Sequence, residues 1–100
     1  MTENGVEEVL EARPKRRSDL LVRSVEGDVV VLDRRDEKIH QLNATAAFIW
    51  ECCDGRHSVV DIAQRLATQF KVDLGVVKGD VAGAVLKLRD LGLLVSTAEK

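Results

Sequence analysis

The chain has 100 residues, of which 45% are hydrophobic and 32% charged, a composition typical of one small globular domain. Its formal net charge of -2 disfavours a dedicated nucleic-acid binder, and no apolar run approaches the roughly 20 residues that span a bilayer. The polar, acidic start does not resemble a secretory signal, so we expect a cytoplasmic protein with free thiols at the adjacent Cys52 and Cys53.

The first 18 residues are polar and include a basic run from Arg13 to Arg17. No apolar residues accompany this run, so we expect residues 1–18 to form a disordered, solvated tail. The folded domain is then expected over residues 19–95, followed by a second polar tail at residues 96–100. A basic patch also suits DNA, and composition leaves that alternative open.

Three strands are predicted next. Residues 20–25 and 28–33 are rich in β-branched and aliphatic side chains. They are separated by Glu26-Gly27, a pair that suits a tight turn because glycine accepts positive φ. A third, shorter strand is expected over residues 37–42. Its low apolar content is typical of an edge strand with one side unpaired.

Two helices follow, each with apolar residues at helical spacing on one face. Asn43 is expected to cap a helix over residues 44–53. Ser58 is expected to cap a second helix, whose apolar face extends to Phe70. With a third helix after them, this order predicts an α+β fold, in which a three-stranded antiparallel sheet precedes three helices in a winged helix-turn-helix-like arrangement.

The third helix is expected to begin at Asp73 or Gly75 and to run to about Leu91. Its predicted outer face is small, apolar and partly acidic, a poor match to a DNA major groove. Gly79 and Gly83 each cost a helix on the order of 1 kcal/mol relative to alanine. Either a ligand approaches this face closely, or the glycines permit close packing within the protein.

Residues for catalysis or metal binding are few. His40, Cys52, Cys53 and His57 are the candidate metal ligands, but zinc sites use spaced cysteine pairs, and neighbours on a helix point about 100° apart. We therefore expect no metal site and no cofactor. Cys52 and His57 come with no recognisable oxyanion hole, and the chain has no phosphate-binding loop, so an enzyme is not expected either.

Several motifs resemble those of the PqqD family. The segment Ile39–Trp50, with the sequence IHQLNATAAFIW, resembles the family's strand-to-helix segment. Residues 53–55 (CDG) and 58–63 (SVVDIA) are similar to its second-helix entry, and residues 91–94 (LGLL) to the end of its closing helix. Taken together, the resemblance covers about residues 20–95.

This resemblance implies a module that recognises the leader of a ribosomally made, post-translationally modified precursor peptide. The leader would add a fourth strand beside the third. The module would then present it to a modifying enzyme, often a radical S-adenosylmethionine protein, as in pyrroloquinoline quinone synthesis. On matching positions, the peptide contacts fall on the third strand and the last helix, at Glu37, Lys38, Ile39, His40, Gln41, Leu42, Ala82, Val85, Leu86 and Arg89.

Two other hypotheses stay open beside the peptide chaperone. A winged-helix DNA-binding regulator would use the Arg13–Arg17 run together with Lys78 and Arg89, and its affinity would fall steeply with salt. A homodimer is the third hypothesis, because an unpaired strand edge can also exchange strands between two copies.

Overall fold

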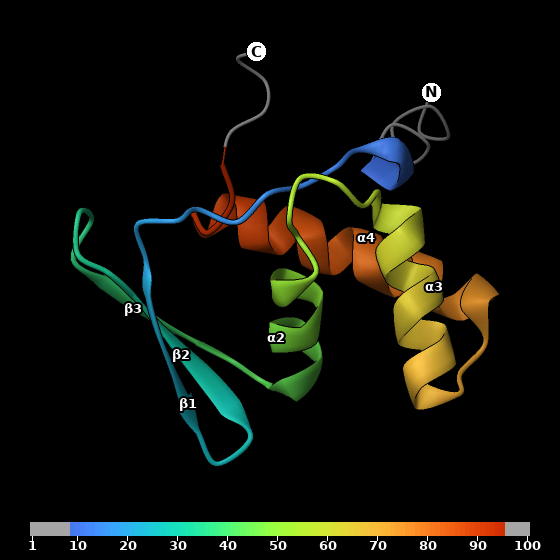
Figure 1. Ribbon diagram of the computed structural model, residues 1–100, viewed down its shortest axis with the longest axis horizontal. Coiled ribbons are helices and arrows are strands. Elements are labelled where there is room, and N and C mark those ends of the chain that lie inside the picture. Colours follow the sequence, from blue (N-terminus) through green and yellow to red (C-terminus); the bar gives the residue numbers. More distant parts are fainter. Residues whose placement is uncertain (1–8, 96–100) are drawn as a thin grey trace.

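The computed structural model describes residues 9–95 (Figure 1). The elements follow the predicted order of strands and then helices: β1 (Leu21–Val25), β2 (Asp28–Asp33), β3 (Lys38–Leu42), α2 (Ala44–Glu51), α3 (Val59–Phe70) and α4 (Leu74–Asp90). The predicted α+β fold class is confirmed, and the observed ends lie within about two residues of those expected. Among the described residues, no helix combines the length and apolar character needed to cross a membrane.

The sheet is antiparallel with β2 in the middle, so β1 and β3 are both edge strands. Glu26 and Gly27, with φ of 51° and 91°, form the predicted two-residue turn between β1 and β2. Val29 and Val31 of β2 are buried, whereas Val30 between them is only half-buried. One face of the sheet is therefore covered, and Figure 1 shows the helices gathered on one side of the sheet.

The core is aliphatic around one indole ring. Trp50 is buried, and its Nε1–H donates a hydrogen bond to the carbonyl of Leu93 at 3.1 Å. The two helix caps expected from the sequence are present. The Asn43 side chain accepts an N–H from the first turn of α2 at 2.8 Å, and Ser58 forms a capping box with Asp61.

Three local expectations are wrong. The Phe70 side chain was expected to be buried but is 47% exposed, because it lies on the last turn of α3, where its ring meets the edge of Phe48. α2 ends at Glu51, because the N–H of Cys52 is shared between two carbonyls of a tightening last turn. Glu37 lies in the turn before β3 with φ of 57°, and not in the strand.

The expected disordered tail at residues 1–18 is also corrected. Residues 9–11 are helical, and residues 12–17 run as an extended segment, here called the N-terminal arm, along the rest of the domain (Figure 1). Residues 1–8 and the predicted tail at 96–100 lie outside the described residues.

Backbone hydrogen bonds hold the N-terminal arm in place. The carbonyl of Pro14 accepts the N–H of Gly55 at 2.9 Å, and the carbonyl of Lys15 accepts the N–H of Val95 at 2.7 Å. Gly55 has φ of 82°, and a Cβ there would lie 3.3 Å from the Lys15 side chain, so glycine suits this close approach. The arm thus joins the α2–α3 loop to the segment that follows α4.

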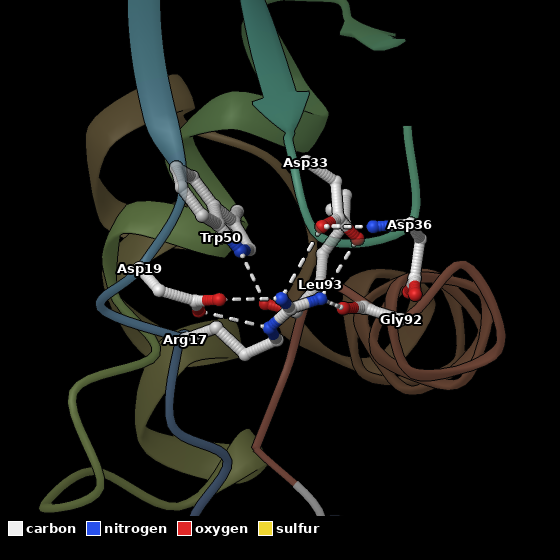
Figure 2. Close-up of polar contacts among 7 residues, drawn as sticks. All are labelled: Arg17, Asp19, Asp33, Asp36, Trp50, Gly92 and Leu93. Atoms are coloured by element: carbon white, nitrogen blue, oxygen red, sulfur yellow. Dashed lines mark hydrogen bonds and ion pairs between the residues drawn. The ribbon is translucent and has the colours of Figure 1, made fainter. Parts of the chain in front are cut away.

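The strongest polar anchor of the arm is Arg17 (Figure 2). Its Nη1 donates to Asp33 Oδ2 at 2.9 Å and to the carbonyl of Gly92 at 2.8 Å. Asp19 accepts two further bonds, at 3.0 and 2.7 Å. The Arg17 side chain is only 9% exposed and that of Asp33 1%, so each charge depends on the other for compensation.

The Arg17–Asp33 pair makes the stability of the fold depend on pH. Hydrogen bonding from Arg17 lowers the pKa of Asp33 from 3.8 to about 2. A carboxyl group whose pKa is lower in the folded state stabilises the fold fully above its unfolded pKa. That contribution is lost as the pH falls through the folded value.

We therefore expect Asp33→Asn to lower the free energy of unfolding at pH 7, and the difference from wild type to shrink between about pH 4 and pH 2. Chemical denaturation at several pH values measures both quantities. Asp90→Asn is the control, because the Asp90 side chain is 75% exposed. A difference between wild type and Asp33→Asn that stayed constant with pH would contradict this account of the pair.

Candidate functional site

The hydrogen-bond phase of the sheet follows from its first turn. A two-residue turn makes the closing pair, Val25 and Asp28, a hydrogen-bonded pair, and bonded and non-bonded pairs alternate along antiparallel strands. Val30 of β2 therefore bonds to β1. Val29 and Val31 bond instead to β3.

The same alternation identifies the free groups of β3. His40 is opposite Val31 and Leu42 is opposite Val29, so the backbones of these two residues bond to β2. The N–H and C=O groups of Ile39 and Gln41 point away from β2. Ile39 is also 70% exposed, the highest value among the large exposed hydrophobic residues. This edge therefore offers unpaired backbone groups beside an exposed apolar side chain.

The last helix, α4, does not lie beside this edge. A hydrogen-bonded neighbouring strand lies 4.7–4.9 Å away. No Cα atom of α4 lies within 8 Å of a Cα atom of any strand. Within residues 9–95, β3 pairs with β2 alone.

The predicted peptide contacts divide into exposed and buried groups. Leu42, Ala82 and Val85 are 5%, 8% and 6% exposed and belong to the hydrophobic core. Ala82 and Val85 are covered because α4 packs against both α2 and α3, which widens its buried face. Leu86 and His40 are half-buried, and the exposed members are Glu37, Lys38, Ile39, Gln41 and Arg89.

The glycines of α4 face open space. A Cβ built at Gly79 or Gly83 would meet no atom within 4 Å outside its immediate surroundings. Close packing within the described chain therefore does not account for these residues.

His40 adds an unpaired polar atom to β3. Its Nε2 is buried and has no hydrogen-bond partner within the described residues. A buried polar group without a partner costs about 1–3 kcal/mol, so a group that pairs with it would be favoured.

The cysteines and His57, which were candidate metal ligands, lie in separate local settings. His57 Nδ1 pairs with Asp54 at 2.9 Å, and hydrogen bonds from the backbone of Arg56 and from His57 hold the pKa of Asp54 well below its usual range. In the part of the chain that the structure describes, no three His, Cys, Asp or Glu side chains group closely enough to hold a metal ion. Burial raises the pKa of Cys53 to about 12 and also raises that of Cys52.

These raised pKa values predict unreactive thiols, because the thiolate is the nucleophile. We expect iodoacetamide at pH 8 to modify half-buried Cys52 slowly and buried Cys53 hardly at all. Mass spectrometry should show two adducts only after denaturation. Rapid double modification of the native protein would contradict the burial of Cys53.

Two residues of the basic run, Arg16 and Arg17, are engaged within the chain. The Arg16 guanidinium lies over the Trp50 ring, 5.8 Å from its centroid, and donates to the carbonyl of Glu51. Arg17 is held by the Asp33 pair. Two of the arginines on which a DNA interface would depend therefore already have partners.

Comparisons with known proteins point to one family. The family model described as coenzyme PQQ synthesis protein D (PqqD) matches residues 28–94. A lasso peptide synthetase B1, solved in complex with the leader peptide, is 30% identical with a TM-score of 0.73; the match covers 85% of this chain and 100% of that one. No curated protein sequence matches the chain.

Two further solved structures share the fold. One is the PqqD truncation of Methylobacterium extorquens PqqCD, described as a stand-alone recognition element for ribosomally synthesized and post-translationally modified peptides. It is 22% identical over 83% of this chain and 88% of that one, with a TM-score of 0.68. The other is TbiB1 in complex with the TbiA(beta) leader peptide, which is 20% identical over 80% and 93% of the two chains, with a TM-score of 0.70.

Proposed function

Because the chain belongs to the PqqD family, whose model matches residues 28–94, we propose that it binds the leader of a ribosomally made precursor peptide and presents it to a modifying enzyme. The observation that supports this most directly is the unpaired edge of β3. The lasso peptide synthetase B1 supports it further, since that relative is complexed with a leader peptide.

In this proposal the leader joins the sheet as a fourth strand. Its backbone bonds to the free N–H and C=O groups of Ile39 and Gln41, which gives affinity with little dependence on sequence. Selectivity comes from side chains beside the edge. Exposed Ile39, the unpaired Nε2 of His40, and Leu86 and Arg89 at the end of α4 are the proposed contributors.

The chain itself carries out no chemistry in this proposal. It delivers the leader to an enzyme, and a radical S-adenosylmethionine protein is the class that the family resemblance implies. The proposed location is the cytoplasm, a reducing compartment in which Cys52 and Cys53 would stay free thiols. Strand exchange between two copies would use the same edge, so leader binding and dimerisation should compete.

Amide NMR spectra test the proposal. Synthetic leader segments of a short peptide encoded beside the gene are added to the labelled protein. Saturable shifts are expected at residues 37–42 and 82–89. If no segment produces them, leader binding at this site fails, and a DNA titration at low salt then tests the DNA-binding hypothesis.

Proline substitution tests which edge binds. Gln41→Pro removes an outward N–H of β3 without breaking a backbone hydrogen bond to β2, and we expect at least about tenfold weaker leader binding. It also removes the exposed side-chain bond from Gln41 to Asp28 at 2.8 Å. Ser24→Pro is the matched control, because Ser24 has the same hydrogen-bond phase on the other edge strand, β1. Both affinities are measured by calorimetry on variants whose fold has been checked by circular dichroism.

Unchanged affinity in a folded Gln41→Pro variant would exclude the β3 edge. A loss confined to Ser24→Pro would move the binding site to β1.

A further inference from the structure

Arg17 links two parts of the fold whose backbones lie apart. No Cα atom of α4 comes within 8 Å of the sheet. One nitrogen of Arg17, Nη1, nevertheless bonds both to Asp33 at the end of β2 and to the carbonyl of Gly92 just beyond α4 (Figure 2). The guanidinium is therefore a direct polar tie between sheet and helix.

On the sheet, the partner of Arg17 is Asp33, which lies next to the start of β3. Asp33 is the register partner of Lys38, the first residue of that strand. The Oδ1 atom of Asp33 also accepts the backbone N–H of Asp36 at 3.2 Å, which holds the turn between β2 and β3. Asp33 thus lies opposite the residue at which the free edge begins.

On the helix, the tie reaches the last turn of α4. The N–H of Gly92 donates to the carbonyl of Arg89 at 3.0 Å, and that of Leu93 to the carbonyl of Leu88 at 3.0 Å. Arg89, a proposed leader contact, lies in this turn, and Leu86, another, comes directly before it. The Arg17 side chain therefore joins both sides of the proposed binding site.

The geometry requires a guanidinium. Besides the Nη1 bonds, Nε and Nη2 donate to Asp19 at 3.0 and 2.7 Å, and Nη2 also reaches Asp33 at 3.3 Å. Five contacts to three acceptor groups use the planar fork of donors. A lysine ammonium retains the charge but cannot reproduce this arrangement.

We propose that Arg17, which lies outside the residues matched by the family model, is a positioning residue that holds the β3 edge and the end of α4 at the spacing a leader requires. The inference rests on the function proposed above. Its effect is preorganisation. The free protein already holds the β3 edge and the end of α4 as they are in the complex, so less binding free energy is lost in ordering them.

Arg17→Lys tests the proposal, with Arg16→Lys as a control on the same arm. We expect Arg17→Lys to weaken leader binding about tenfold and Arg16→Lys to change it less than about twofold. In the free protein, Arg17→Lys should shift the amides of residues 38–42 and 86–92. At saturation with leader, its spectrum in these regions should return to that of the wild-type complex.

Stability is measured separately, and binding is compared at a temperature where each variant is fully folded, so unfolding does not enter the affinity. If Arg17→Lys does not fold, Asp19→Asn is the milder variant, because it disturbs the orientation of the guanidinium through a side chain that is 51% exposed. A smaller loss of affinity and shifts in the same two regions are then expected.

Wild-type affinity in a folded Arg17→Lys variant, or amide shifts confined to the neighbourhood of residue 17, would overturn the inference. If the wild-type protein binds no leader segment, the proposed function fails instead. The spectra of the free variants would still decide whether Arg17 holds the two elements together.

Discussion

The ion pair between Arg17 and Asp33 is the interaction on which the rest of the arrangement depends. Removing two charges from water is costly unless each is paired and its remaining hydrogen-bonding groups are satisfied. Asp19, the Asp36 N–H and the Gly92 carbonyl supply those partners. The N-terminal arm is therefore part of the domain and joins the sheet to the end of α4.

The second constraint is the phase of the β-sheet. The Glu26-Gly27 turn determines which residues of β2 hydrogen-bond to β1. The alternate residues of β2 then bond to β3, which determines the bonded residues of that strand too. As a result, Ile39 and Gln41 carry the free groups. An open edge with an exposed isoleucine is an aggregation hazard unless a partner covers it. A domain that captures extended peptides has a use for such an edge.

The side chains that suggest chemistry have structural roles instead. Cys53 is buried and donates to the carbonyl of Ile49, and His57 pairs with Asp54 in the loop before α3. Arg16 covers the indole of Trp50. The features that remain for function are a strand edge, the unpaired Nε2 of His40 and the end of α4, which together describe a surface for recognition.

The sequence by itself determined the order and approximate bounds of the elements, the caps at Asn43 and Ser58 and the Glu26-Gly27 turn, because these depend on residues within a few positions of one another. Only the tertiary structure decided the course of the N-terminal arm and the burial of Ala82 and Val85. Two of the groups that bury Arg17, Asp33 and the Gly92 carbonyl, lie 16 and 75 residues away, so its basic run looks solvated when read locally. α4 packs against both α2 and α3. The spacing of apolar residues along one helix indicates one buried face, so it does not reveal the second neighbour.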